Sequence, residues 1–565
     1  MTQSDKGRKA RQGFRQGRKM TSMALGSVAL AVAGSAGALE LSTGNSDLTA
    51  RFDNSVRYNL GLRGEGIDSR IGNTPTANSG DYKFRKAGDV VMNRVDLLSE
   101  FEAEYQKKFG LRVSAAAWYD QAYDNTKEKT NPSLAPFYAP SYNNGQYSSY
   151  TKRWYRDGAE LLDAFAYVNT DVNGHALSLK LGQHVVYWGN AIFSGAGIAY
   201  SQQPIDGRKG LSEPGAEVRE LFLPLNQLSG TYQATQAVQI AGQYYFDWDH
   251  VRSPEGGTYF GGNNFTLDGP DSMFGLAQRL SPLGPKNKRG DWGVATRISP
   301  PSWNGTTVGL YYREFTEKNG LWLDANGLGA LAAGVALPEY TYRAVYPRNT
   351  KVIGASLDTT VGPVAVGAEL VLRKNAGLNS LTVNPDTNEG ARGDVYHAIV
   401  NAIYGVPRMA VWDSATLTTE LTFDHLASIT KNSALFNGVG GANCPLGWKQ
   451  GCATRNAWGL AVRFEPAYNQ IFPGVDLTLP ISVQAGLHGN TADFGGTNQG
   501  QVLWSVGAQF TMHNNWTITL SYSDMIAKIV RDGGTNALGQ PTYTGNGNWS
   551  LTDRGIFMLT AKASF

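Results

Sequence analysis

The last eleven residues, Gly555 to Phe565, alternate between apolar and polar side chains, and this pattern constrains the chain most. One face of the predicted strand carries Phe557, Leu559, Ala561, Ala563 and Phe565. The other face carries Met558, Thr560, Lys562 and Ser564. Successive side chains on a strand point to opposite faces, so one face of this strand suits an apolar environment and the other suits water. Such a strand is typical of the wall of a membrane β-barrel.

The same alternation recurs along the chain, at 48–62, 238–248, 477–485, 502–511 and 516–523. Eight brief connections are predicted as hairpin turns, at 108–110, 173–174, 235–237, 301–305, 361–363, 406–415, 466–475 and 513–515. Long stretches separate the hairpins, at 63–93, 124–158, 187–226, 249–290, 316–350, 374–394, 425–455, 488–501 and 526–554. Short periplasmic turns that alternate with long external loops are the topology of outer-membrane barrels, whereas a soluble antiparallel sheet has no reason to alternate them.

Eight hairpins with a first and a last strand predict an all-β fold, a closed antiparallel transmembrane β-barrel of about 18 strands, within a range of 16 to 20. The composition agrees, because mean hydropathy is −0.31 and charged residues are only 17% of the 565 residues. After the first forty residues there is no apolar run of the roughly 20 residues that a spanning helix needs. A barrel of this size encloses a lumen unless something fills it, so we expect one or more long loops to fold inward.

Residues 1–38 are predicted to be a secretory signal peptide and 39–565 the barrel. A basic region precedes the short apolar stretch 23–33, and the small residues 36–38 offer a cleavage site. The alternative is a membrane anchor. Removing this segment takes away seven basic residues and one acidic residue, which changes the formal net charge from +3 to −3. The basic balance that would favour nucleic-acid binding therefore belongs to the signal segment, and we expect no nucleic-acid partner.

The two cysteines, Cys444 and Cys452, stand eight positions apart in a Gly- and Asn-rich stretch. In an exported protein this spacing predicts one local disulfide that closes a loop. A metal pair is the alternative, but there is no nearby histidine or further cysteine to complete a ligand set. We therefore expect no metal and no cofactor.

A charged, Pro-punctuated stretch between 181 and 228 is the first candidate site. Its charges of both signs could pair inside the lumen and hold the loop there as a constriction. The candidate lumen residues are Gln183, His184, Trp188, Asp206, Arg208, Lys209, Glu217, Arg219 and Glu220. The alternatives are a solvated surface loop and, for His184, a packed and hydrogen-bonded side chain.

A second candidate is the unusually apolar loop 316–350. It contains Leu321, Trp322, Leu323, Leu328 and Leu331. An exposed apolar loop is costly in water unless it packs or binds something. The hypothesis is a hydrophobic patch at an entrance or in the lumen, and the alternative is a small helix packed on neighbouring loops.

Catalysis has little support, because the chain contains no nucleophile elbow and no zinc-protease motif. An outer-membrane hydrolase would need a paired His and Asp, and two adjacent pairs occur, Asp249 with His250 and Asp424 with His425. Neighbours on a strand face opposite ways, which argues against cooperation within either pair. We therefore do not expect an enzyme.

Two boxes in the first candidate stretch resemble a known family. The first box contains Gly182, Gln183, His184, Val185, Val186, Trp188 and Gly189. The second contains Pro204, Asp206, Lys209, Pro214, Gly215, Ala216, Glu217, Glu220, Leu223 and Pro224. Together with the segments 93–101 and 113–120, they resemble the exported proteins of Gram-negative bacteria known as domain of unknown function 1302. Asn190 stands where the family pattern has Glu, and Gly210 shifts Leu211 by one place.

The resemblance implies an outer-membrane location. It also implies association with a second exported, periplasmic partner family and with an inner-membrane exporter of the resistance-nodulation-division type. The expected surroundings are outer-membrane lipid, lipopolysaccharide and the barrel-assembly machinery. Taken with the barrel pattern, the prediction is a channel or conduit for small hydrophobic or amphipathic molecules. The alternative is a structural or surface-recognition barrel without transport.

Overall fold

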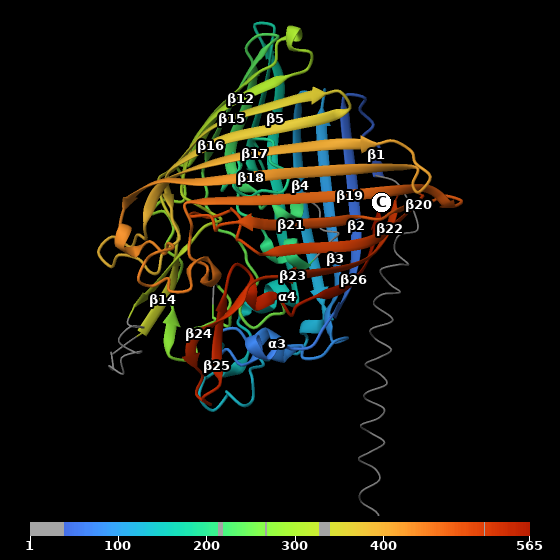
Figure 1. Ribbon diagram of the computed structural model, residues 1–565. Helices are drawn as coiled ribbons and strands as arrows, with labels where there is room; N and C mark the ends of the chain where they lie inside the picture. Colours follow the sequence, from blue (N-terminus) through green and yellow to red (C-terminus); the bar gives the residue numbers. More distant parts are fainter. Residues whose placement is uncertain (1–38, 213–217, 266–267, 327–339, 514) are drawn as a thin grey trace, which may run out of the picture.

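The chain forms one closed antiparallel β-barrel, seen from the side in Figure 1. The structure is a computed structural model that describes residues 39–565 apart from 213–217, 266–267, 327–339 and 514. The predicted signal segment, 1–38, lies outside the described residues. Closure comes from the pairing of β2 with β26, in which Ser55 lies opposite Ser564 and Arg63 lies opposite Ile556.

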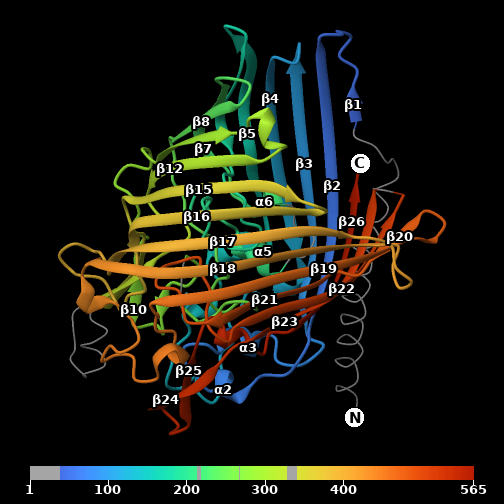
Figure 2. The same ribbon diagram turned by 45° about the horizontal axis from the view of Figure 1, so that its top comes forward.

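The first half of the wall consists of β2 (Leu48–Arg63), β3 (Val90–Tyr105), β4 (Phe109–Asp120), β5 (Asp157–Val172), β6 (His175–His184), β7 (Leu225–Gln233), β8 (Val238–Tyr245), β11 (Trp292–Ile298) and β12 (Thr307–Phe315). The second half consists of β15 (Thr350–Val361), β16 (Val364–Gly377), β17 (Arg392–Val406), β18 (Ser414–Lys431), β19 (Asn456–Phe472), β20 (Val475–Thr478), β21 (Ile481–His488), β22 (Val502–Met512), β23 (Trp516–Ile526) and β26 (Ile556–Ser564). Strands β12 and β15 to β18 run side by side in Figure 2, each hydrogen-bonded to the next.

The predicted strand number is confirmed. The sheet has 20 hydrogen-bonded segments, of which β20 and β21 are two halves of one strand, because both pair with β19 and with β22. The short β1 (Leu39–Leu41) pairs with residues 50–52 of β2, beyond the point where β26 ends. The wall therefore has 18 strands.

All eight predicted hairpin turns are present. The turn at 173–174 uses Asn173 and Gly174 with φ of 54° and 79°, the left-handed values that a two-residue hairpin of this kind requires and that Asn and Gly adopt easily. One turn is tighter than predicted, because β19 continues to Phe472 and leaves two residues before Val475. The carboxyl terminus lies at this turn end, where the Ser564 amide donates to the Asn515 carbonyl oxygen.

The two faces of the wall differ in chemistry, as the alternation predicts. Side chains that point outward include Leu181, Leu310, Leu370, Leu520 and Phe557, each at least half exposed. Side chains that point inward include Asn59, Arg313, Glu369 and Glu420, each nearly fully buried by the contents of the barrel. The barrel is therefore apolar outside and polar within.

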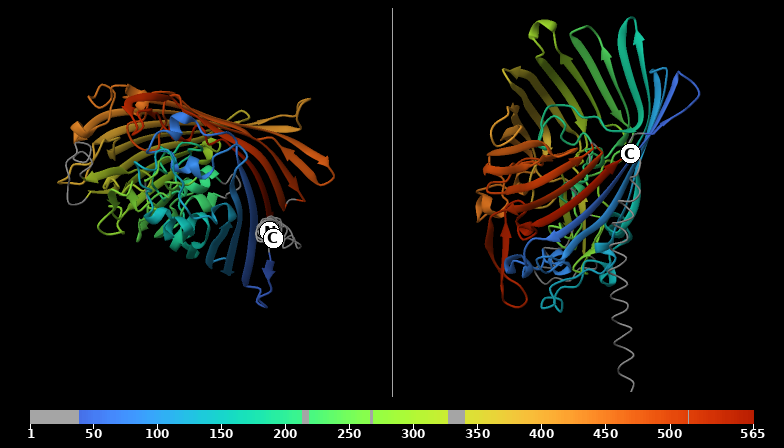
Figure 3. Two further views of the ribbon diagram at one scale, coloured as in Figure 1. Left: turned by 90° about the horizontal axis from the view of Figure 1, so that it is seen from below. Right: turned by 90° about the vertical axis from the view of Figure 1, so that its right-hand side faces the viewer.

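The long loops gather at the other end and fold into further elements, in blue, teal and green in the view from below (Figure 3). The helices are α2 (Ser69–Gly72), α3 (Ser79–Lys83), α4 (Ser149–Tyr155), α5 (Gly207–Ser212) and α6 (Val218–Leu221). A four-stranded sheet contains β9 (Ser272–Met273), β10 (Ala277–Arg279), β13 (Trp322–Asn326) and β14 (Tyr340–Val345), and a hairpin contains β24 (Ile529–Thr535) and β25 (Pro541–Gly545). No described helix has the length and apolar character needed to cross a membrane.

Candidate functional site: a loop that crosses the barrel

The segment between β6 and β7, residues 185–224, enters the barrel and contacts its wall on several sides in its described parts, 185–212 and 218–224. We call this segment the lumen loop. Residues 190–198 reach inward-facing side chains of β16 and β18, whereas Glu220 reaches Arg57 on β2. Because β18 and β2 are far apart around the wall, the loop spans the lumen. The sequence-predicted constriction loop is thus inside the barrel, although the prediction could not say which wall residues hold it.

Two carboxylates hold the first part of the lumen loop through its backbone. Glu369 on β16 accepts hydrogen bonds from the amides of Asn190, Ala191 (2.8 Å) and Ile198 (2.7 Å). Glu420 on β18 accepts from the amides of Ile192 (2.6 Å), Phe193 (3.0 Å) and Ser194 (2.5 Å). Hydrogen bonds to an ionised acceptor are among the stronger ones in proteins. We call Glu369 and Glu420 the carboxylate clamp.

Two arginines hold the carbonyl side of the same segment. Arg313 on β12 donates to the carbonyl oxygens of Ile198 (2.8 Å) and Tyr200 (2.7 Å). Arg373 on β16 donates to the carbonyl oxygen of Ala196 (3.1 Å) and lies 3.6 Å from the ring centroid of Tyr200. Arg373 also donates to the Asp493 carboxylate at 2.5 Å, which ties the lumen loop to the loop between β21 and β22.

The second part of the lumen loop is held by buried ion pairs. Arg57 lies 2.8 Å from Glu220, and Lys209 lies 3.4 Å from Glu160 on β5 and 3.8 Å from Glu220. Arg208 pairs with Asp206 at 2.5 Å, and Arg252 pairs with Glu160 at 2.6 Å. Removing one partner of a buried pair leaves an uncompensated charge, so such a cluster fixes one arrangement of the loop.

The charge of Asp206 is secured by its neighbours. Burial would raise the pKa of this carboxyl, but the adjacent Arg208, with Lys209 and Arg252, outweighs burial and holds the pKa at about 2. Asp206 is therefore ionised at physiological pH, the charge state that its pairing with Arg208 requires.

Three other predicted lumen residues, Trp188, His184 and Gln183, differ in the direction and the contacts of their side chains. Trp188 is buried in the lumen loop and packs with Ile198 and with Tyr311 of β12. His184 is buried, and its ring contacts the Gly182 carbonyl oxygen (2.9 Å) and the Ser229 hydroxyl (2.7 Å), which is the packed arrangement. Gln183 is the neighbour of inward-facing His184 on β6, so it faces outward and does not line the lumen.

Two predicted residues are described in part or not at all. Glu217 lies outside the described residues. Arg219 belongs to α6, but its side chain is outside the described part.

The sequence prediction missed four residues that hold the lumen loop: Glu369, Glu420, Arg313 and Arg373. The one sequence signal for these four residues was their position on the polar face of alternating strands. Many other polar residues share that face, so the signal could not single them out.

The described residues of the apolar loop 316–350, which exclude 327–339, pack against neighbouring segments. Trp322 is 2% exposed, contacts Val345 and Val383, and donates from its indole nitrogen to the Leu378 carbonyl oxygen at 2.8 Å. Residues 322–326 form β13 rather than the helix proposed as an alternative, because they pair with β14. Leu321 and Leu323 are half-buried, and Leu328 and Leu331 lie outside the described residues.

The two His–Asp pairs also differ. The side chain of His425 is hydrogen-bonded to Asn456, whereas that of Asp424 is hydrogen-bonded to His397 on the other face of the wall. Asp424 and His425 are therefore separated, as expected. The expectation is wrong for His250, which contacts both Asp249 (3.2 Å) and Asp268 (2.7 Å), because these residues lie beyond the end of β8. Burial lowers the pKa of His250, but its hydrogen bonds to the two carboxylates outweigh burial and raise it to about 9. A histidine protonated at neutral pH is a poor general base.

In the described ranges there is no cluster of three or more His, Cys, Asp or Glu suited to a metal ion.

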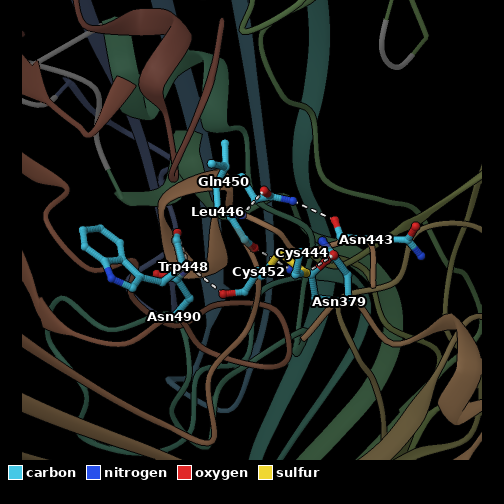
Figure 4. Close-up of a disulfide and its surroundings, with 10 residues drawn as sticks. Asn379, Asn443, Cys444, Leu446, Trp448, Gln450, Cys452 and Asn490 are labelled. Carbon is cyan, nitrogen blue, oxygen red and sulfur yellow. Dashed lines mark hydrogen bonds between the residues drawn. A yellow bond between two sulfur atoms is a disulfide. The ribbon is translucent and has the colours of Figure 1, made fainter. Parts of the chain in front are cut away.

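Cys444 and Cys452 form a disulfide in the loop between β18 and β19 (Figure 4). Neighbouring loops bind this disulfide loop through asparagines. Asn490 donates to the carbonyl oxygens of Trp448 (3.0 Å) and Cys452 (2.9 Å), and Asn379 donates to that of Gly451 (2.9 Å). The disulfide therefore rigidifies a junction of three external loops.

Replacing both cysteines, C444S/C452S, should loosen this junction without opening the barrel. Closing a loop of this length contributes about 2–3 kcal/mol through the entropy of the open chain. We expect faster tryptic cleavage after Lys449 in the folded protein, while cleavage after the exposed Lys288 in a distant loop stays unchanged. Equal cleavage rates after Lys449 in both proteins would show that the asparagine contacts alone hold the loop.

Two cavities flank the lumen loop. One cavity, of about 350 Å³, lies on the side of the loop that faces the hairpin turns, against β6, β7, β8, β11 and β12. The other, of about 180 Å³, lies between residues 193–195 and the wall from β18 to β22. The fold and the site thus define a class, an 18-stranded barrel whose lumen is crossed by an inward-folded loop.

The particular family is shown by a family model. The model for the protein of unknown function DUF1302 matches residues 19–565, so the chain belongs to this family. No curated protein matches the chain.

The chain is also similar to solved structures of bacterial proteins. The outer membrane protein OpdK from Pseudomonas aeruginosa is 10% identical over 91% of this chain and 98% of its own, with a TM-score of 0.40. OccK9 (OpdG) from Pseudomonas aeruginosa is 11% identical over 91% and 98%, with a TM-score of 0.42. OccAB1 from Acinetobacter baumannii is 8% identical over 91% and 96%, with a TM-score of 0.42.

Proposed function

We propose that this barrel is an outer-membrane conduit for small hydrophobic or amphipathic molecules and that the lumen loop is its constriction. The location is supported by the wall itself. Large apolar side chains stand exposed around its outer face, and such a surface is stable in contact with lipid but costly in water. The short turns then lie at the periplasmic end and the long loops at the external end.

The observation that carries the proposal is the span of the lumen loop from β16 and β18 to β2, with a cavity on either side. A solid structural barrel has no need of water-accessible space beside a fixed internal loop. In a channel, a fixed loop sets the pore width and the charges that a solute meets. The apolar part of the solute preference is supported by Trp188, Tyr311 and the adjacent Val185 and Val186, which line the larger cavity.

The test is single-channel recording of the purified protein in planar lipid bilayers. We expect discrete current steps from the intact protein and larger steps from a variant in which residues 190–198 are replaced by a short Gly-Ser linker. Heat-modifiable gel mobility should verify that both proteins are folded barrels. A folded protein that carries no current in either form would overturn the conduit and favour a structural or surface-recognition barrel.

A further inference from the structure

The larger cavity, which we call the turn-side vestibule, is lined by residues that indicate which class of solute it binds. Its wall residues are inward-facing positions of β6, β7, β8, β11 and β12, and its roof is residues 185–188 of the lumen loop. The volume of about 350 Å³ suits a small organic molecule.

One part of the vestibule is apolar. Val185, Val186 and Trp188 contribute from the lumen loop, and Ala241, Ala295 and Tyr311 contribute from the wall. Tyr311 and Trp188 pack against each other, with ring centroids 6.1 Å apart, so this surface is rigid. A hydrocarbon chain or ring would lose water-exposed area by resting on it.

The charged lining residues of the vestibule are both cations, Lys180 on β6 and Arg297 on β11. Both side chains are exposed to the vestibule, and within the described part of the chain neither forms an ion pair. Three inter-strand spacings separate β6 from β11, and the register aligns Lys180 with Gly293, four residues before Arg297. The Cα atoms of Lys180 and Arg297 are therefore about 20 Å apart along the wall, and their long side chains extend into the vestibule from two of its sides. By contrast, Lys209 of the lumen loop and Arg57 of β2 are neutralised by carboxylates.

Two uncompensated cations in a concave site produce a positive potential that attracts anions. We propose that the turn-side vestibule binds amphipathic anions, with the apolar body on the Trp188–Tyr311 surface and an anionic head group near Lys180 and Arg297. This inference rests on the proposed conduit and names the class of solute it selects. Neutral molecules of the same size gain the apolar contact alone, and amphipathic cations are repelled.

The experiment compares three eight-carbon probes, octanoate, octan-1-ol and octylammonium, by titration calorimetry on the full-length barrel in lipid nanodiscs. We expect octanoate to bind most tightly and octylammonium most weakly. The variant K180Q/R297Q should lose about tenfold in octanoate affinity, as expected for two solvent-accessible charge contacts, and should bind octan-1-ol as the unaltered protein does. The matched control is R408Q, in which Arg408 is 81% exposed on the turn between β17 and β18.

Octanoate affinity that is equal in K180Q/R297Q and in the unaltered protein would overturn the inference, as would equal affinity for octylammonium. Bilayer currents separate this failure from that of the conduit. A protein that carries current but does not prefer octanoate refutes the anion site alone. A protein that binds octanoate through Lys180 and Arg297 but carries no current refutes the conduit alone.

Discussion

Replacing both residues of the carboxylate clamp, E369Q/E420Q, should release the lumen loop and increase single-channel conductance. Six amides of residues 190–198 donate to the carboxyl oxygens of Glu369 and Glu420. A glutamine offers one neutral acceptor, and its own amide group opposes the remaining donors. Losing about 3 kcal/mol across the clamp would raise the population of the released loop on the order of a hundredfold.

The control for this prediction is E314Q. Glu314 lies near the end of β12, and its described ion pair is a 3.8 Å contact with Lys351. Replacing Glu314 by glutamine therefore makes the same chemical change without altering the contacts of the lumen loop. We expect E314Q to conduct like the unaltered protein. If E369Q/E420Q also conducts identically while remaining a folded barrel, the loop is held by its arginines and ion pairs, and the clamp is dispensable.

The second large effect is expected from R373M. This change removes the buried charge that binds the Ala196 carbonyl oxygen, the Phe494 carbonyl oxygen and the Asp493 carboxylate. Burial would raise the pKa of Asp493, but Arg373 and His397 outweigh it and lower that pKa, so the carboxylate is charged and would lose its principal partner. Breaking a buried pair in this way costs about 3–5 kcal/mol. The temperature at which the barrel loses its heat-modifiable mobility should fall accordingly.

A double-mutant cycle distinguishes the ion pair from simple loss of packing. The variant R373M/D493N removes both charges and should recover much of the stability that R373M loses, because no buried carboxylate is then left uncompensated. R408M, at the exposed turn, should leave stability unchanged. A double variant that is no more stable than R373M would assign the effect to the ring contact with Tyr200 instead.

The wall of this barrel was predictable from sequence because its determinants are local. Alternation in β2, β23 and β26 follows from the two faces of a strand, and the eight turns follow from short polar connections between such segments. The four-stranded sheet of the loop end was not predicted, because it forms only when β14, which pairs with β13 of its own loop, also pairs with β10 of another loop. Trp322 illustrates this, since its burial depends on Val383 in a different loop.

The site was predictable only in outline. A stretch rich in charges of both signs indicated an inward loop, and Asp206, Arg208, Lys209 and Glu220 do lie inside the barrel. Their partners, however, stand far away in sequence: Glu220 pairs with a residue 163 positions earlier. The carboxylate clamp left no local trace, because Glu369 and Glu420 act on backbone amides that any loop sequence provides.

The seam between β2 and β26 has a consequence for biogenesis. The strand that completes the circle, β26, pairs with β2 from the opposite end of the described sequence, so the cylinder cannot be sealed before both strands are in place. Until β2 and β26 pair, two strand edges with unsatisfied amides and carbonyls remain open, and contacts of such great sequence separation form slowly. Without β26 there would be no strand between β2 and β23, and the cylinder would be open along its length.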